Sequence, residues 1–390
     1  MQKFLGSKVR VLVLGLEENG LGVLRALRGR SDLDVRAVSF SPHDPGRLTW
    51  LAPILRWPDS AEDPDGFESR LYNWSRARGT TTLFPTRDVE VNLLASLSNT
   101  LPDNLIFHRN SISQVSALTD KRFVSKIASE VGLDLPKTVV LNEKIDLSSL
   151  GFCYPIIIKP YGQNSNQFPY KNLFISNVAE LEEVLSKNIG WRGRVVLQEY
   201  IPGGDDQVYQ CNLLLGHRPR VIAAIEFHKI RQYLPGRGIA SYGETTLSTV
   251  LVPLCLRLAD AVDYQGLMSV EFKKDLRNCR WIFIETNLRL PAYNAVFPSS
   301  GVNLAYLYVL NLLGKEDLLA VPKRIALWMN EDLDSANVLT HKVRLRLLSW
   351  IRQAIKVDSF AFWCWEDPLP GLYCIGRILY KAFKRLFFRQ

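Results

Sequence analysis

GLMSVEFKKDLRNCRWIFIETNLRLP, residues 266–291, is the most informative stretch of this chain. Apolar and β-branched residues fill two runs, 267–273 and 280–287, which are typical of strands. The polar sequence Asp-Leu-Arg-Asn at 275–278 lies between them and favours a turn. The stretch therefore predicts a β-hairpin, which we expect to be centred on Asn278.

Two carboxylates meet across this hairpin. Glu271 and Glu285 each lie seven residues from Asn278, so they are expected to face one another. Asn287 follows on the same face because strand side chains alternate, and Arg289 continues the series. Opposed carboxylates repel, and a hard divalent cation such as Mg²⁺ would compensate them through oxygen ligands. The alternative is an edge hairpin whose acids are simply solvated.

The series Glu271, then Glu285-Thr-Asn287-Leu-Arg289, resembles the metal and phosphate signature of the ATP-grasp superfamily, whose ligases carry Glu followed by E-x-N-x-R. The resemblance implies ATP and Mg²⁺ (or Mn²⁺) as cofactors. It also implies that Glu271, Glu285 and Asn287 bind the metal, and that Arg289 is a catalytic residue on a terminal phosphate. The implied fold class is α/β, with an N-terminal doubly wound domain, a two-lobed α+β ATP-grasp fold and a basic helical C-terminal tail.

Composition indicates an ordinary globular protein. The chain has 390 residues, of which 47% are hydrophobic and 22% charged, and this length accommodates two or three domains. No apolar run reaches the roughly 18 residues of a spanning helix, and no secretory signal is visible, so we expect a cytoplasmic protein. The six cysteines show no C-x-x-C spacing, which argues against structural zinc.

The expected domain organisation has three parts. Residues 8–15, 21–30 and 35–40 read as a strand, a helix and a strand joined by a glycine turn, the unit of a doubly wound sheet. We expect the loop at 17–22, and Arg87 after a strand at 81–85, to lie near a second substrate, although Arg87 is more often a surface charge. The predicted domains are an N-terminal Rossmann-like domain (1–115), an ATP-grasp domain (116–315, with lobes 116–200 and 201–315) and a C-terminal extension (316–390).

Two lysines resemble the phosphate-binding lysines of ATP-grasp enzymes. Lys121 stands near the start of a helix predicted between 116 and 136, with Phe123 on its apolar stripe. Lys159 ends the buried strand YPIIIKP, where a charge needs a partner such as a phosphate. The segment 161–166 that follows would be the flap over the phosphates, and it has one glycine where many members have several.

The resemblance also implies an adenine site. The strand RVVLQEY at 194–200 runs into Ile-Pro-Gly-Gly-Asp-Asp. In ATP-grasp proteins such a hinge holds adenine near Tyr200 and Ile201, with Glu199 accepting from the amino group and Asp206 binding the ribose. A plain turn between strands is the alternative, because Pro-Gly-Gly-Asp predicts a turn as well.

A basic row follows on the next strand. Alternation places Lys229, Arg231 and Tyr233 on one face, where cations would stabilise an anionic intermediate. We expect Arg231 to bind a carboxylate or the transferred phosphate, with Lys229 as a solvated alternate. The string K-x-R-Q-Y is similar to uncharacterised carboxylate-amine ligases associated with cell-surface polysaccharide genes.

The tail differs from the rest of the chain. Residues 340–390 contain ten Lys or Arg against three acids, which is +7 of the chain's +9. Helical patterns at 340–357 and 372–389 are amphipathic, basic and aromatic. Three interpretations stay open: peripheral contact with the inner face of a membrane, a partner helix, or a helix packed on its own domain. No nucleic-acid motif accompanies the charge, so no nucleic acid is expected.

The resemblance implies an ATP-dependent carboxylate-amine ligase that works through an acyl phosphate. Its partners would be a small-molecule carboxylate and an amine, whose identities the sequence does not give, and neither does it give the oligomeric state. The alternative is a non-catalytic ATP-binding protein that acts as a membrane-associated scaffold or regulator.

Overall fold

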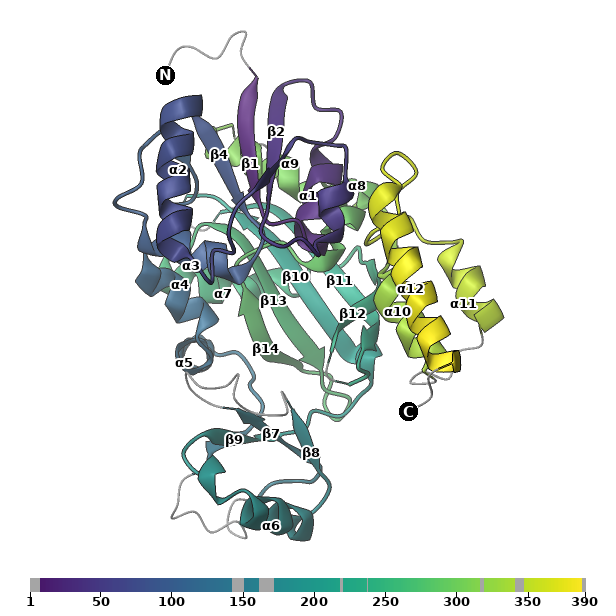
Figure 1. Cartoon of the computed structure of the whole chain (residues 1–390). Helices are drawn as coiled ribbons and strands as arrows, with labels where there is room; N and C mark the ends of the chain where they lie inside the picture. Colours follow the sequence, from purple (N-terminus) through teal and green to yellow (C-terminus); the bar gives the residue numbers. More distant parts are fainter. Residues whose placement is uncertain are drawn as a thin grey trace.

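The chain folds around three β-sheets. The computed structural model describes residues 8–141, 151–160, 172–217, 220–236, 238–315, 319–340 and 347–387. An N-terminal domain covers one side of a large central sheet, a small lobe stands apart at one end, and the C-terminal helices lie at another edge (Figure 1). The candidate site lies where the N-terminal domain meets the central sheet.

The N-terminal domain is a parallel five-stranded sheet in the order β3-β2-β1-β4-β5. Side chains of the central strand β1 alternate between two cores: Val11 and Val13 face one, and Leu12 and Leu14 the other. Helices therefore cover both faces, which confirms the doubly wound prediction. The elements are β1 (Val9–Leu14), α1 (Glu18–Leu27), β2 (Leu33–Ser39), η1 (Pro45–Leu48), β3 (Ile54–Arg56), α2 (Pro64–Arg78), β4 (Thr81–Pro85), α3 (Asp88–Ser96) and β5 (Leu105–Ile106).

Helix α1 packs closely on the segment that follows the hairpin. A Cβ added at Gly22 would lie 2.5 Å from the side-chain oxygen of Asn294, so only glycine allows this approach. Asn294 Nδ2 in turn donates to the Asn19 carbonyl at 2.9 Å. The glycines after β1 thus serve helix packing, and the N-terminal domain is fixed against the central sheet.

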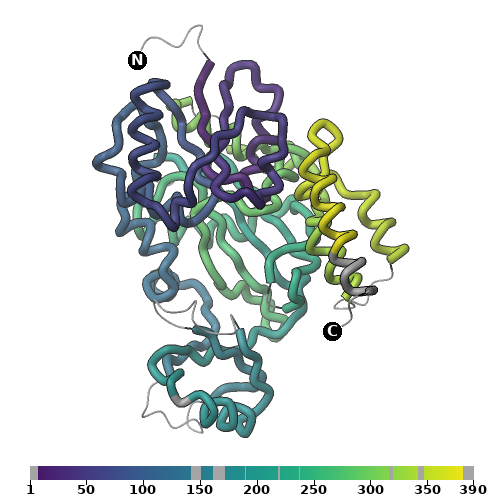
Figure 2. Tube along the Cα trace, in the orientation of Figure 1, coloured from purple at the N-terminus to yellow at the C-terminus, as the bar shows by residue number. Residues whose placement is uncertain are grey.

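The small lobe is an antiparallel sheet in the order β6-β9-β7-β8 with one long helix on it. Its core of buried Ile, Leu and Val is separate from the other cores, and the lobe extends away from the rest of the chain (Figure 2). The three isoleucines before Lys159 lie in β7, one of its two inner strands, and the prediction of a strand here is confirmed. The elements are β6 (Thr138–Val140), β7 (Ile156–Pro160), β8 (Leu173–Ile175), α6 (Val178–Lys187), η4 (Ile189–Trp191) and β9 (Val195–Glu199).

The central sheet has seven strands in the order β14-β13-β10-β11-β12-β15-β16. On one face, Val270 and Phe272 pack with the helices α4, α5 and α7; on the other, Ile225 and Phe227 pack with Tyr293, α9 and the N-terminal domain. The elements are α4 (Ile112–Thr119), α5 (Lys121–Glu130), η5 (Asp205–Gln207), β10 (Val208–Leu215), β11 (Val221–Tyr233), β12 (Ile239–Thr245), α7 (Val252–Val262), β13 (Gly266–Lys274), β14 (Trp281–Asn287), η6 (Ala292–Val296), α8 (Phe297–Ser300), α9 (Leu304–Leu312), β15 (Leu327–Met329) and β16 (Ser359–Phe360).

One predicted helix is two. Asp120 ends α4 and caps α5, where its side chain accepts from the backbone N–H of Arg122. The rotation at this break turns Phe123 outward, and it is 51% exposed. The prediction that Phe123 belongs to a buried apolar stripe is therefore wrong, and Val124 and Ala128 are buried in its place.

The C-terminal extension is more than a helical tail. Strands β15 and β16 complete the central sheet, with β15 antiparallel to β12 and β16 parallel to β15. Asp367 is fully buried against the N-terminal domain and accepts from Thr49 Oγ1 at 2.7 Å. Helices α10 (Glu331–Leu339), α11 (Leu347–Ala354) and α12 (Leu369–Phe387) follow these strands. Within the described ranges, every helix is too short or too polar to cross a bilayer.

Candidate functional site

The hairpin β13–β14 pairs Glu271 with Glu285, as predicted. A β-bulge brings this about, because near the turn Lys274 pairs with Trp281, a register that would set Ile284 opposite Glu271. The extra residue at Ile284 shifts the pairing by one. The two carboxylates therefore meet on the face that packs toward the N-terminal domain.

A buried lysine compensates the first carboxylate. Lys229 on β11 places Nζ 2.5 Å from Glu271 Oε2, and Lys229 is 4% exposed. The prediction that Lys229 is solvated is wrong, because only β10 separates β11 from β13 in the sheet and Lys229 lies close to Glu271. We call Lys229, Glu271, Glu285, Asn287 and Arg289 the polar cluster; Asn287 Nδ2 lies 3.5 Å from Glu285 Oε1.

Buried polar side chains hold the strands beneath the polar cluster. Tyr293 donates its hydroxyl to Gln210 Oε1 at 2.5 Å, and burial raises the pKa of Tyr293 well above its ordinary value. Ser269 Oγ lies 2.7 Å from Asn212 Oδ1 and 3.1 Å from the Arg289 carbonyl oxygen. These hydrogen bonds fix the backbone on either side of Glu271 and position Arg289.

The N-terminal domain reaches Arg289. Asp88, the first residue of α3, places Oδ2 3.0 Å from Arg289 Nη2, and Asn19 Nδ2 donates to the Leu290 carbonyl at 2.9 Å. Residues 17–22, which were expected to form a loop, lie mostly in the first turns of α1, and they adjoin the polar cluster together with the start of α3. Arg87 itself points elsewhere, because Asp59 and Glu90 bind its guanidinium.

The hinge joins the small lobe to the central sheet. Glu199 Oε1 lies 2.7 Å from Arg277 Nη1 in the turn of the hairpin, and the hydroxyl of Tyr200 donates to the Gly203 carbonyl at 3.1 Å. Ile201 is buried, whereas Asp206 is exposed and its carbonyl oxygen lies 2.8 Å from His228 Nε2. The carboxylate of Glu199 is thus occupied by an arginine, while its predicted role toward adenine stays a prediction.

Two hinge residues escaped the sequence analysis. Lys273 is buried with Nζ 4.7 Å from the centre of the Tyr200 ring, and burial lowers its pKa. It follows Glu271 by two residues, so strand alternation alone would have placed it on the same face. Asp205 accepts from the backbone N–H groups of Gln232 and Gly236 and fastens the hinge to β11.

The remaining predicted residues lie outside the polar cluster. Lys159 donates to Gln198 Oε1 at 2.5 Å in the small lobe, and Lys121 is exposed at the start of α5. Arg231 is held by the buried Asp334, with Nη2 2.7 Å from Oδ2, and by Gln353 Oε1 at 2.8 Å. The predicted flap at 161–166 lies outside the described residues.

The donor set suits a hard divalent cation. Carboxylates of Glu271 and Glu285 stand opposite one another with the amide of Asn287 beside them, and oxygen ligands of this kind are the ones Mg²⁺ takes. The protein offers two carboxylates here, and among the described residues no group of three or more His, Cys, Asp or Glu side chains is placed to hold a metal ion. Water and phosphate oxygens normally complete magnesium sites.

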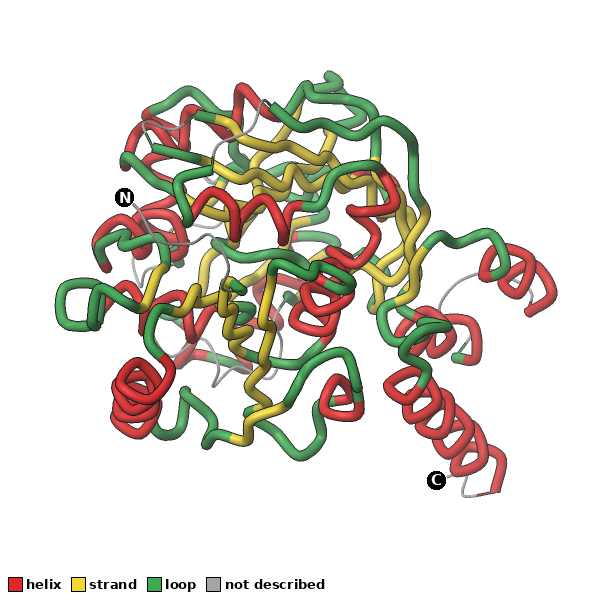
Figure 3. The backbone as a smooth tube through the Cα atoms, turned by 90° about the horizontal axis from the view of Figure 1, so that it is seen from above, coloured by secondary structure: helices red, strands yellow, loops and turns green. Residues whose placement is uncertain are grey.

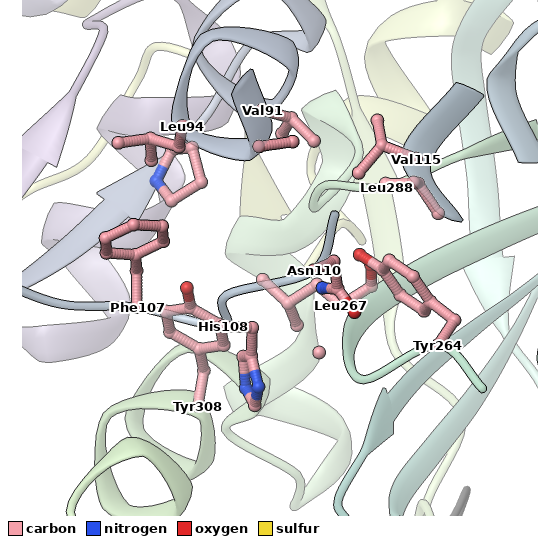
Figure 4. Close-up of a pocket in the computed structure, with 13 residues that line it drawn as sticks. Val91, Leu94, Phe107, His108, Asn110, Val115, Tyr264, Leu267, Leu288 and Tyr308 are labelled. Carbon is pink, nitrogen blue, oxygen red and sulfur yellow. The ribbon is translucent and has the colours of Figure 1, made fainter. Parts of the chain in front are cut away.

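A small apolar cavity lies under Leu288, between α3, α4 and the start of β13 (Figure 4). Its walls include Phe107, Tyr264 and Tyr308, and burial lowers the pKa of the adjoining His108 to about 4, which keeps that imidazole neutral. A cavity with uncharged walls does not suit a triphosphate, so we place the candidate site at the polar cluster.

Comparisons with known proteins give one distant relative and a set of similar folds. No family model matches the chain. A D-aspartate ligase from Enterococcus faecium (strain Aus0004) is 21% identical over 321 residues, which cover 75% of this chain and 74% of the relative.

Solved structures resemble the whole architecture. N5-carboxyaminoimidazole synthetase from Staphylococcus aureus superposes with a TM-score of 0.62 at 14% identity, covering 87% of this chain and 86% of that one. An L-amino acid ligase from Bacillus licheniformis gives 0.58 at 14% identity, with 82% and 79% covered. The biotin carboxylase domain of the 2-oxoglutarate carboxylase from Hydrogenobacter thermophilus, in complex with MgADP and bicarbonate, gives 0.60 at 16% identity, with 82% and 73% covered. The parallel N-terminal sheet, the two antiparallel sheets and these likenesses together show that the chain has the α/β ATP-grasp fold.

Proposed function

We propose that this protein is an ATP-dependent ligase that joins a carboxylate to an amine. The observation that carries the proposal is the pairing of Glu271 with Glu285, with Lys229 and Arg289 beside them. The similar D-aspartate ligase and L-amino acid ligase support carboxylate-amine chemistry. The identities of the two substrates are not part of the proposal.

The proposed reaction has two steps. An oxygen of the substrate carboxylate attacks the terminal phosphorus of ATP, and ADP leaves with the bond electrons to give an acyl phosphate. The amine nitrogen then attacks the acyl carbon, phosphate leaves, and loss of a proton from nitrogen gives the amide. No protein nucleophile is needed, because positioning and charge stabilisation account for most of such catalysis.

The residues of this chain divide the work. Arg289 would bind the terminal phosphate with its planar guanidinium, and Lys159 and Lys121 would bind phosphates from the small-lobe side. The hinge at 199–201 and Asp206 would hold adenine and ribose. Glu271, Glu285 and Asn287 would hold Mg²⁺, which when bound neutralises phosphate charge.

The N-terminal domain would shape the acceptor site. Asn19 and Asp88 already border Arg289, so a substrate bound beside the terminal phosphate would contact the first turns of α1 and α3. Lys229 would stabilise negative charge on the acyl phosphate from beneath. Arg231 would act less directly, because Asp334 and Gln353 hold its guanidinium.

Glu285→Gln tests the proposal. The change keeps side-chain size and removes one carboxylate, so we expect Mg²⁺-dependent ADP release with a panel of acids and amines to fall roughly 100-fold or more, with an unchanged melting temperature. Glu244→Gln, on the same sheet but paired with His228, is the matched control and should retain activity. Full turnover in Glu285→Gln would overturn the metal assignment.

A second candidate is a nucleotide-binding protein without turnover. It is favoured by the ion pair between Lys229 and Glu271, because an internal cation already compensates one of the carboxylates. ATP binding with no ADP release, in the presence of the same panel and Mg²⁺, would support this candidate against the ligase.

A further inference from the structure

Two C-terminal helices turn their apolar sides to solvent. Helices α11 and α12 lie at the same edge of the molecule in both views, outside the central sheet (Figures 1 and 3). Leu348 is 72% exposed and Leu379 is 64% exposed, and the aromatic side chain of Trp365 between the helices is 81% exposed. A surface helix of a globular protein normally shows the opposite pattern, with polar residues outward.

The stripe on α12 is continuous. Leu369, Leu372, Ile375 and Leu379 are all exposed, and their spacing of three and four residues puts them on one side of the helix. The opposite side is buried, as Cys374 shows. Helix α12 thus packs on the protein with one face and presents leucine and isoleucine on the other.

Helix α11 is arranged in the same way. Trp350 Nε1 donates to Asp334 at 2.9 Å, and Gln353 Oε1 accepts from Arg231, so this side of α11 faces the central sheet. Leu347, Leu348 and Ile351 are exposed. Helix α11 is therefore held on the protein by hydrogen bonds from its polar side, and its apolar residues are exposed in this packed position.

The same segment is strongly basic, and its acids are engaged elsewhere. Residues 340–390 hold ten Lys or Arg and three acids. Asp358 pairs with Arg324 at 2.7 Å, Glu366 pairs with Arg28 at 2.9 Å, and the third acid is buried. Helix α12 contains four basic residues and no acid. Arg377 of α12 pairs with the buried Asp332 at 3.2 Å, whereas Arg352 and Lys356, in and just after α11, are exposed near the exposed Ile351.

We propose that the exposed apolar side chains of 347–355 and 369–380, which we call the α11–α12 surface, bind the surface of an anionic lipid bilayer. Leucines and isoleucines would enter the boundary between headgroups and acyl chains, Trp365 and Tyr380 would sit at headgroup level, and the exposed Arg352 and Lys356 would attract anionic headgroups. The helices lie on the membrane and do not cross it. The inference stands apart from the proposed ligase chemistry, because no residue of the polar cluster takes part.

Sedimentation of the full chain with vesicles tests this inference. We expect it to pellet with vesicles of phosphatidylcholine containing about 30% phosphatidylglycerol, and to pellet roughly tenfold less with phosphatidylcholine alone or at high salt. Leu348→Glu and Leu379→Glu should each reduce pelleting severalfold. Both residues are exposed, so the melting temperature and ADP release should stay unchanged. Leu247→Glu, at a site that is 58% exposed on another part of the molecule, is the matched control and should pellet like the wild type.

Two results would overturn the inference. One is equal pelleting of the wild type and the Leu348 and Leu379 variants. The other is a wild-type dimer in light scattering that ignores vesicles and becomes a monomer in Leu379→Glu, because a second copy would then cover the α11–α12 surface.

Discussion

Lys229→Met removes the positive charge whose Nζ lies 2.5 Å from Glu271 Oε2. Two unit charges 2.5 Å apart attract by roughly 7 kcal/mol at an effective dielectric constant of about 20, and the desolvation of both groups offsets part of this. Removing one partner leaves the Glu271 carboxylate facing Glu285. We expect a loss of about 3 kcal/mol, or roughly 6 °C in melting temperature.

A double-mutant cycle separates the ion pair from side-chain packing. Lys229→Met, Glu271→Gln and the double variant would be melted with and without Mg²⁺. The double variant should be more stable than either single variant, because each single change leaves one buried charge without its partner and the double change leaves none. Added Mg²⁺ should stabilise Lys229→Met more than the wild type, since the cation replaces the lysine charge. Additive single effects, or an equal response to Mg²⁺ in both proteins, would refute this account of the polar cluster.

Three further predictions concern Asp88, Glu331 and Asp334. Asp88→Asn frees Arg289 from a partly exposed ion pair, so we expect stability to change by less than about 1 kcal/mol and nucleotide affinity in a fluorescence titration to rise up to about fivefold; weaker binding would contradict this. Burial raises the pKa of Glu331 from 4.5 to about 7, so the folded protein retains a proton that the unfolded chain releases, and stability should fall by about 3 kcal/mol as pH rises through that window. Between about pH 4.5 and 7, the melting temperature of Glu331→Gln should depend less on pH than that of the wild type. An equal pH dependence in both proteins would contradict the raised pKa of Glu331. Asp334→Ala leaves the Arg231 guanidinium without its carboxylate and should destabilise the protein by about 3 kcal/mol in thermal melts, and a shift within error would contradict this role.

The hairpin was predictable because its signals are local. Alternation, a polar turn and two acids at matched distances were enough to pair Glu271 with Glu285. The bulge at Ile284 was not predictable, because it depends on a turn one residue tighter than the symmetric one. The pairing was thus right, although the predicted centre of the turn was not.

Contacts between distant segments account for what the sequence did not reveal. Lys229 on β11 lies beside Glu271 on β13 because only β10 separates these two strands in the sheet. The order of residues along the chain does not reveal this order of strands. Arg231 is held by Asp334, which lies 103 residues further along. Asp88 directly follows Arg87, which was expected near a second substrate, but the packing of the domains decides that Asp88 is the one that reaches Arg289.

Short strands limited the prediction of the C-terminal extension. β15 has three residues and β16 has two, too few for a periodic pattern. The basic helices nearby carried the stronger signal, so the extension was interpreted as helical. Packing of the extension on its own domain was one of the alternatives. The structure shows such packing for α12, and the apolar side chains on the other side of this helix are exposed.

The position of β15 has a consequence for biosynthesis. Until residue 327 leaves the ribosome, β12 stands at the border of an incomplete sheet with its outer hydrogen-bonding groups unsatisfied. A nascent chain at that stage offers a template to other strands, so it needs shielding by a chaperone or rapid elongation. Ribosome-stalled chains that end shortly before 327 should therefore aggregate, whereas chains long enough to release β16 should stay dispersed.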